Sequence, residues 1–359
     1  MLPWVEKYRP KRLEDVVGNR EALERMMVLA REGNMPNLIL SGPPGCGKTT
    51  SVLALAHTLL GAKYSECVLE LNASDDRGID VVRNTIKLFA HKKVADLPPG
   101  RHKIVILDEA DAMTVGAQQA LRRTMEVFSA STRFALACNY SAEVIEPIQS
   151  RCAVVRFSRL ADADVLAMLR RVADAEHVHV TDDGYQAILF AAEGDMRHAI
   201  NTLQAAAAGN ALDTAGAATA AVVDAKAVYA VADQPHPEIV RRALRHCLDG
   251  NFDEAQKLFC ALVYQGYAPN DVVATIFRVL KSAGSGVDSS SNSGSSGSSS
   301  GSTSIGTEAQ RLEFMREIGL AHVVTGAEGV NTLTQLMGLV ARLCLKKAAP
   351  APASAAAPL

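Results

Sequence analysis

The sequence lacks the patterns that mark a secreted, zinc-bound or membrane-embedded chain. Its seven cysteines form no Cys-x-x-Cys pair and no cluster with histidine at metal-ligand spacing, which excludes a disulfide framework and a structural zinc site. No window of about eighteen apolar residues occurs, and the opening MLPWVEKYRPKR carries charges where a signal peptide needs an apolar stretch. We therefore expect a soluble, intracellular chain in a reducing compartment, with no membrane partner.

An excess of charge of one sign is also missing, and aromatic residues are few. Lys plus Arg total 37 and Asp plus Glu total 39, so the formal net charge is −2. This excludes a chain that is basic throughout and coats nucleic acid, so any such contact must be local. The 5% aromatic share, with many alanines, favours helices with small packing residues. At roughly 150 residues per domain, the 359 residues predict two to three domains.

Short β-branched runs alternate with helical patterns between residues 38 and 157. This alternation predicts a parallel sheet covered by helices. The expected strands are Leu38 to Leu40, Val68 to Leu71, Ile104 to Leu107, Phe134 to Cys138 and Val154 to Phe157. Beyond Leu160 apolar residues recur at helical spacing, so we expect the second half of the chain to be all-helical.

Two segments have compositions that predict disorder. Residues 284–307 are almost entirely Ser and Gly and interrupt a helical pattern. Such a segment cannot bury enough apolar surface to offset the entropy of ordering. The Ala- and Pro-rich residues 348–359 are expected to form a disordered tail.

The strongest motif is a glycine-rich loop between a predicted strand and a predicted helix. Its glycines allow backbone N–H groups to face phosphates, and the following helix N-terminus adds a positive dipole end. Lys48 is placed to reach the β and γ phosphates, and Thr49 to bring a hydroxyl to Mg²⁺. The expected ATP contacts are Gly42, Pro43, Pro44, Gly45, Cys46, Gly47, Lys48, Thr49 and Thr50.

A second motif places carboxylates at the end of the predicted strand Ile104 to Leu107. Ligands of open α/β sheets bind at this edge, so Asp108 is expected to hold Mg²⁺ together with Thr49. Glu109 would point the other way along the pleat and could act as the base for the attacking water. Alone, this motif is better explained as a solvated acidic loop. Beside a phosphate loop it predicts hydrolysis.

Four motifs together resemble the small subunits of eukaryotic replication factor C. The motifs are WVEKYRP at residues 4–10, LNASDDRGID at 71–80, Asp-Glu-Ala-Asp at 108–111 and Ser-Arg-Cys at 150–152. That family is the AAA+ clamp loader, which opens and closes the sliding clamp on primed DNA. The resemblance covers nearly the whole chain apart from the Ser/Gly segment and the tail. Residues 31–34 and 116–123 most resemble the subunit 2 type.

The resemblance implies a three-part architecture and a set of partners. The α/β P-loop AAA+ domain would cover residues 1–160, a helical lid 161–225 and an all-α collar 226–347. The cofactors would be ATP and Mg²⁺. The partners would be one large and three other small subunits of replication factor C, the sliding clamp (proliferating cell nuclear antigen) and primer-template DNA, in the nucleus.

The resemblance also implies roles for single residues that would otherwise be interpreted as surface or packing positions. Asn139 resembles the sensor of the γ-phosphate or attacking water, and Arg197 a second sensor on the lid. Arg9 and Val17 resemble residues that line the adenine. Arg151 resembles an arginine finger that acts in trans on a neighbour's ATP. At position 46 the family usually has threonine, so Cys46 is a departure; backbone contacts there predict little change, although the thiol is a possible target of oxidation.

One segment of the near-neutral chain is strongly basic. Residues 77–103 contain seven Lys and Arg and two Asp, a net charge of +5. On a helix expected from Ile79 to His91, Arg83, Lys87 and His91 form one stripe, which can follow a phosphate backbone. The expected DNA contacts are Arg83 and Lys87, then Arg77; a solvated basic face is the alternative.

Two other functions stay open for this sequence. One is a different AAA+ motor, such as a branch-migration helicase, which a homohexamer of the purified chain would favour. The other is a scaffold that binds nucleotide without turnover, which near-zero ATPase activity in the complex would favour.

Overall fold

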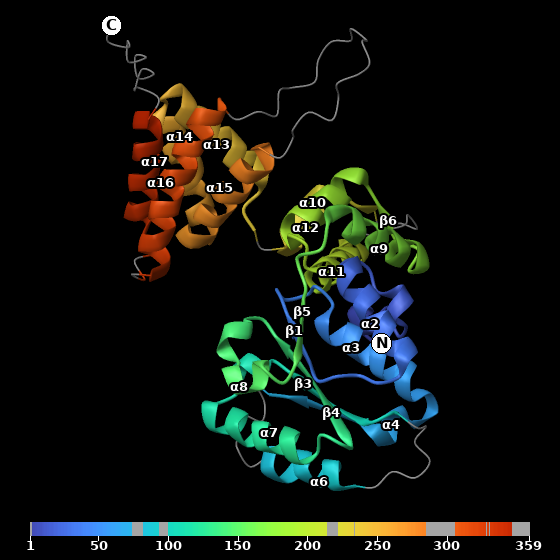
Figure 1. Cartoon of the computed structure of the whole chain (residues 1–359). Helices are drawn as coiled ribbons and strands as arrows, with labels where there is room; N and C mark the ends of the chain where they lie inside the picture. Colours follow the sequence, from blue (N-terminus) through green and yellow to red (C-terminus); the bar gives the residue numbers. More distant parts are fainter. Residues whose placement is uncertain are drawn as a thin grey trace, which may run out of the picture. The chain divides into compact units, whose positions relative to one another are not determined.

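The structure, a computed structural model, describes residues 2–73, 82–92, 100–213, 222–232, 234–284, 306–327, 329 and 331–346 (Figure 1). The chain forms two compact units, Met1–Val231 and Ala232–Leu359. Residues 285–305 of the expected Ser/Gly segment and the whole expected tail lie outside the described residues. The expected domain boundaries at residues 160 and 225 stay predictions.

A five-stranded parallel sheet with strand order β2-β3-β4-β1-β5 forms the centre of the first unit. The strands are β1 Leu38–Ser41, β2 Val68–Asn72, β3 Lys103–Asp108, β4 Thr132–Cys138 and β5 Ala153–Arg156. All five expected strands are confirmed, each to within about two residues at either end. Because the strands are parallel, their carboxyl ends meet at one edge of the sheet, where ligands of such folds bind.

The two faces of this sheet are covered by different helices (Figure 1). Ile104 and Ile106 of β3 enter a core shared with α2 Arg20–Glu32 and α3 Lys48–Leu60, whereas Val105 and Leu107 enter a core shared with α7 Val115–Val127. This is the two-residue alternation of a strand that is buried on both faces. It places the side chain of Asp108 on the side of α3.

The segment expected to form one α-helix from Ile79 to His91 is only partly α-helical. Residues 79–81 lie outside the described residues, Val82–Ile86 form a π-helical turn, η3, and only Lys87–His91 form an α-helix, α6. Ile86 and Ala90 are buried and Lys87 is exposed. A π-helical turn has more residues per turn than an α-helix, so the stripe expected from spacings of four residues does not apply across it.

Four further helices of the first unit pack around a separate core, to which the N-terminal segment adds Trp4, Val5 and Tyr8. These helices are α9 Asp162–Ala175, α10 Asp182–Ala192, α11 Met196–Asp213 and α12 Ala225–Ala232. A small parallel sheet, β6 His179–Val180 with β7 Val222–Val223, also belongs here. The expectation that the chain is all-helical beyond Leu160 is therefore wrong. Strands of two residues are too short to show an alternating pattern.

Short elements connect the larger ones of the first unit. They are α1 Trp4–Lys7, η1 Leu13–Asp15, η2 Gly61–Lys63, α4 Tyr64–Cys67, η4 Ala110–Ala112, η5 Ser141–Glu143 and α8 Glu146–Gln149.

Among the described residues of the second unit, the only regular elements are helices. Its helices are α13 Pro237–Asp249, α14 Phe252–Tyr264, α15 Pro269–Gly284, α16 Glu308–Ala327 and α17 Leu333–Leu345. Leu244, Phe259, Ile276 and Leu339 are among its fully buried side chains. Within the described part of the chain, no helix is long and apolar enough to cross a bilayer.

Candidate active site

A cleft opens at the carboxyl edge of the large sheet, where the glycine-rich loop leads from β1 into α3. Residues Pro44 to Thr50 line it, as do Asp108, Glu109 and Asn139 at the ends of β3 and β4. The helical part of the unit contributes Met168, Met196, Arg197 and Ile200, and the N-terminal segment contributes Val5, Glu6, Tyr8, Arg9, Pro10, Val16 and Val17. The structure thus brings together in one cleft most of the residues expected to bind ATP.

Gly42 and Pro43 do not line the cleft but contact Lys48, which does. A Cβ at Gly42 would lie 2.3 Å from the carbonyl oxygen of Phe157, so only glycine fits there. The Lys48 ammonium is mostly buried and donates to the carbonyl oxygens of Gly42, at 2.7 Å, and Pro43, at 2.8 Å. These two residues therefore hold the lysine in place from within the loop.

Lys48 also contacts the residue that resembles a sensor. Its Nζ donates to Oδ1 of Asn139 at 3.0 Å. The Asn139 backbone N–H in turn donates to Oδ2 of Asp111 at 2.9 Å. Asp111 is the last residue of the Asp-Glu-Ala-Asp motif, and no role was predicted for it. Its position fixes where β4 ends relative to β3.

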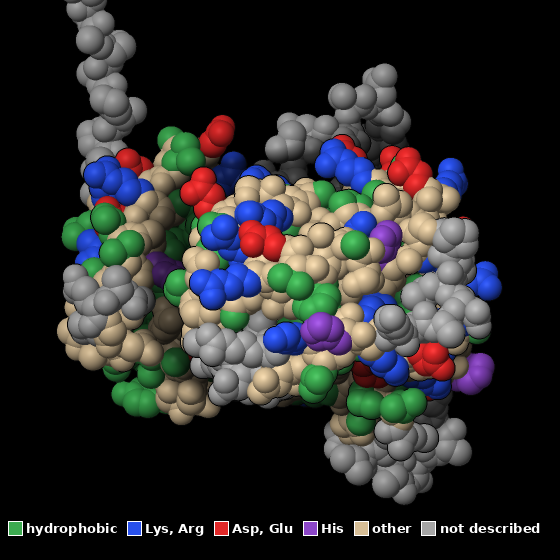
Figure 2. Space-filling model, turned by 60° about the horizontal axis from the view of Figure 1, so that its bottom comes forward, with side chains coloured by type: hydrophobic (Ala, Val, Ile, Leu, Met, Phe, Trp, Pro, Cys, Tyr) green, Lys and Arg blue, Asp and Glu red, His purple; other side chains and the backbone are tan. Residues whose placement is uncertain are grey.

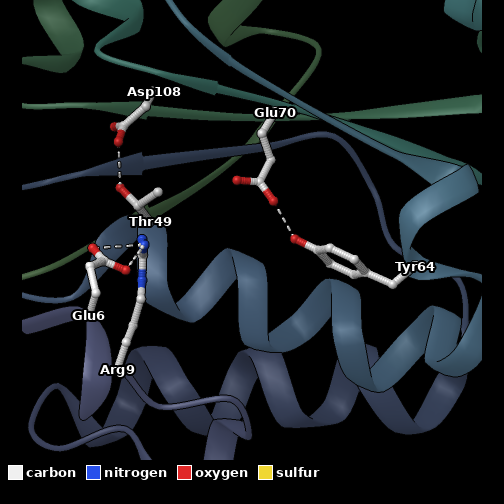
Figure 3. A network of polar contacts seen from close by, with 6 residues as sticks. All are labelled: Glu6, Arg9, Thr49, Tyr64, Glu70 and Asp108. Atoms are coloured by element: carbon white, nitrogen blue, oxygen red, sulfur yellow. Dashed lines mark hydrogen bonds and ion pairs between the residues drawn. The ribbon is translucent and has the colours of Figure 1, made fainter. Parts of the chain in front are cut away.

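The two residues expected to hold magnesium lie side by side (Figure 3). Oγ1 of Thr49, in the first turn of α3, donates to Oδ2 of Asp108 at 2.9 Å. A hydroxyl and a carboxylate oxygen are the hard donors that Mg²⁺ takes from proteins, usually with substrate phosphates completing its shell. Among the described residues no group of three or more His, Cys, Asp or Glu could hold a metal ion. The pair therefore fits an ion that depends on bound phosphates.

Glu109 differs from its expected geometry. The strand ends at Asp108, and Glu109 is in the left-handed conformation with φ 52°, with its N–H donating to Oδ1 of Asp108 at 3.0 Å. The prediction that strand alternation sets its direction is therefore wrong. Glu109 is nevertheless exposed at the cleft, where a general base would be needed.

The N-terminal segment closes another side of the cleft. Arg9 lines it and is paired with Glu6, one turn earlier, at 3.1 Å (Figure 3). The Tyr8 hydroxyl and the Lys7 ammonium each donate to Oε1 of Glu176, at the end of α9, at 2.7 Å. These hydrogen bonds lower the pKa of Glu176. The segment is thus attached to the helical part as well as to the cleft.

The Cys46 thiol is buried, although the residue lies along the cleft. It is 1% exposed, and its Sγ–H donates to the carbonyl oxygen of Pro43 at 2.9 Å. Burial raises its pKa, more strongly than the nearby Lys48 lowers it. Since the thiolate is the reactive form, the structure argues against the oxidation that the sequence suggested.

Arg151 is an exposed residue just after α8 and does not line the cleft. Its Nη2 pairs with Oε1 of Glu126 at 2.7 Å, and its Nη1 donates to the carbonyl oxygen of Pro147, also at 2.7 Å. Arg122 pairs with the same carboxylate at 3.1 Å. Glu126 lies 25 positions before Arg151, and no local pattern predicts this contact.

The residues expected to contact DNA are only partly described. Arg77 lies outside the described residues, as does the side chain of Arg83, whereas Lys87 is exposed at the start of α6. Lys103, counted in the basic segment, is 4% exposed and is not part of a basic surface.

Comparisons with known proteins agree with this fold. Residues 38–160 match the family model described as ATPase family associated with various cellular activities (AAA), and residues 235–342 match the Replication factor C C-terminal domain. The fold and the cleft therefore define an AAA ATPase.

Relatives identify the family within this class. Replication factor C subunit 2 of Arabidopsis thaliana is 53% identical over 98% of this chain and 96% of its own length. Replication factor C subunit 4 of Saccharomyces cerevisiae is 52% identical, with 95% of each chain covered. The chain belongs to the replication factor C small-subunit family. Its relatives carry the names of both subunit 2 and subunit 4.

Solved structures add a likeness of fold alone. The Thermotoga maritima RuvB Holliday junction branch migration motor has a TM-score of 0.51 and 16% identity, with 75% of this chain and 85% of the motor covered. At this identity the likeness does not favour the branch-migration alternative over the clamp-loader family.

Proposed function

We propose that this chain is an ATP-binding and ATP-hydrolysing subunit of the clamp loader that places the sliding clamp on primed DNA. One observation carries the proposal: the chain has a cleft lined by its own phosphate loop and, away from it, an exposed arginine of the family's Ser-Arg-Cys signature. An arginine outside its own cleft is suited to act on the ATP of a neighbouring subunit.

Within the cleft, each polar residue has a separate task. Lys48 supplies the positive charge for phosphate oxygens, and Asn139, 3.0 Å from its ammonium, acts on the same part of the ligand. Thr49 and Asp108 would hold Mg²⁺, which neutralises phosphate charge when it is bound. Glu109 would orient and deprotonate the attacking water. Arg197, Arg9 and Val17 would contact the nucleotide from the lid and from the N-terminal segment.

The DNA contact is proposed for the end of the first unit that carries α6. Figure 2 brings this end forward and shows Lys and Arg side chains there among hydrophobic and acidic ones. Lys87 is exposed on α6, and the backbone of Arg83 lies one turn before it in η3. Such contacts to phosphates add affinity without reading the sequence of the DNA.

The same proposal includes the assembly and its location. The chain would join one large and three other small subunits, and residues 161–225 and 226–347 would act as its lid and collar. Work on primed DNA implies a location in the nucleus.

Reconstitution of the five-subunit complex tests the proposal. We expect ATPase activity that rises with clamp and primer-template DNA and falls when Lys48→Ala is introduced in this chain alone. Arg25→Ala, at an exposed site on α2, is the matched control and should have no effect. Activity that does not respond to DNA and clamp would favour the scaffold. A homohexamer of the purified chain that moves along DNA would favour the motor.

A further inference from the structure

Lys103, the first residue of β3, is a buried cation. Strand alternation places its side chain with Val105 and Leu107, on the face covered by α6 and α7, and it is 4% exposed. Among the residues that the structure describes, no carboxylate pairs with it. Burial of a cation is unfavourable unless other groups compensate it, so the compensating groups indicate what the lysine does.

Those groups are the carbonyl oxygens at the end of α6. The Lys103 ammonium donates to Phe89 at 2.8 Å, Ala90 at 2.5 Å and Lys92 at 2.7 Å. All three of its hydrogen-bond donors are used, and the partial negative charge of a helix C-terminus favours a cation there. The ammonium also lies 5.4 Å from the centroid of the Phe89 ring. Lys103 therefore fixes the end of α6 to the start of β3.

The two elements that it joins have different tasks. Helix α6 carries the exposed Lys87 and the buried Ala90. Strand β3 ends at Asp108, whose carboxylate accepts the hydroxyl hydrogen of Thr49. Strand β3 thus contacts helix α6 at its first residue and contributes a carboxylate to the ATP site at its last residue.

We propose that Lys103 is a positioning residue that holds the DNA-contacting helix α6 on the strand of the ATP site, so that stimulation of the ATPase by DNA depends on it. This inference rests on the proposed DNA contact of α6. Lys103 would contact neither DNA nor ATP and would act by holding α6 in position.

The test uses the reconstituted complex with Lys103→Met in this chain, which keeps an unbranched side chain, one atom shorter, and removes its charge and donors. We expect the concentration of primer-template DNA that half-saturates ATPase stimulation to rise about fivefold to tenfold, since hydrogen bonds to a charged group are lost. ATPase activity without DNA and the KM for ATP should stay within about twofold, because the cleft is untouched. Amide hydrogen exchange of residues 86–92 should become faster while that of α3 is unchanged. Lys11→Met, at an exposed lysine, is the charge-matched control and should change none of these.

Each outcome decides the inference. Unchanged DNA dependence in a folded Lys103→Met complex, or unchanged exchange in residues 86–92, would overturn it. If the Met variant does not assemble, Lys103→Gln, which is shorter and uncharged but keeps two donors, is put through the same measurements under the same criteria.

Lys87→Ala separates the inference from the proposed function. If Lys87→Ala weakens DNA dependence and the Lys103 variants do not, only the inference fails. If Lys87→Ala has no effect while exchange of α6 still rises, the proposed DNA contact of α6 fails.

Discussion

The backbone N–H of Met196, the first residue of α11, donates to the carbonyl oxygen of Gly45 in the phosphate loop at 3.2 Å. The preceding residue, Asp195, packs so closely on Gly45 that a Cβ there would lie 1.8 Å from its Oδ1. The helix that carries Arg197 is thus joined directly to the loop that would hold the phosphates.

Gly45→Ala should therefore weaken ATP binding. The new methyl group would displace Asp195, and φ of +66° at this position is strained for an L-residue. We expect the Kd for ATP to rise at least about tenfold, which equilibrium binding of a fluorescent ATP analogue measures.

Gly33→Ala is the matched control for this strain. Gly33 also has a left-handed φ, +76°, but nothing lies within 4 Å of an added Cβ. It should lower thermal stability and leave ATP affinity unchanged. If both variants bind ATP like the parent chain, the contact between loop and lid does not matter for binding.

Thr49→Ala should separate binding from hydrolysis. It removes one of the two oxygens proposed to hold Mg²⁺, so hydrolysis at this chain's site should fall about 100-fold. Binding of ATP in the presence of EDTA should hardly change, because Lys48 and the loop remain. Thr49→Ser, which keeps the hydroxyl, should retain most of the activity. Equal losses in Ala and Ser variants would contradict the assignment.

Cys46 should behave as an inert packing residue. Burial raises the pKa of its thiol, and burial raises that of Cys152 to about 12. At pH 8 we expect Cys46 to be alkylated at least about tenfold more slowly in the folded chain than in urea. Mass spectrometry of the modified peptide measures this rate.

Cys46→Thr tests the same position by substitution. A threonine hydroxyl can replace the thiol as donor to the Pro43 carbonyl oxygen, so the KM for ATP should stay within about twofold. A larger change would mean that the thiol itself contributes to nucleotide binding.

Acidification should release the N-terminal segment. Hydrogen bonds from Lys7 and Tyr8 hold the pKa of Glu176 below its ordinary value of 4.5. The stabilisation is therefore fully present above pH 4.5 and is lost as the pH falls below it through the folded-state pKa. Trp4, the one tryptophan of the chain, lies in this segment, so its fluorescence reports the release.

Glu176→Gln should remove this acid transition from the fluorescence titration. Glu24→Gln, an exposed glutamate on α2, is the control and should leave it in place. If the transition persists unchanged in Glu176→Gln, a group other than Glu176 causes it.

The sequence predicted the elements of the cleft well because their signals are local. Apolar runs bounded by Gly42 and Asp108 predicted β1 and β3, and parallel strands must bring their ends together. Contacts between distant residues could not be predicted. A lysine is usually exposed, so the sequence predicted Lys103 to lie on the surface. Its burial is possible because carbonyl groups at the end of α6 accept its hydrogen bonds. The pairs Arg151 with Glu126 and Gly45 with Asp195 likewise depend on packing. The predicted direction of the Glu109 side chain was wrong for a local reason, because the backbone at Glu109 is left-handed and no longer part of the strand.

The most direct test of the account is Arg151→Ala in the reconstituted complex, with ATP binding to this chain and ATPase activity of the complex both measured. Arg25→Ala serves again as control. We predict that this chain keeps its own ATP affinity while DNA-stimulated hydrolysis at the neighbouring site falls about 10³-fold, the typical contribution of an arginine finger. Loss of this chain's own ATP binding, or hydrolysis equal to that of the unmodified complex, would contradict the account.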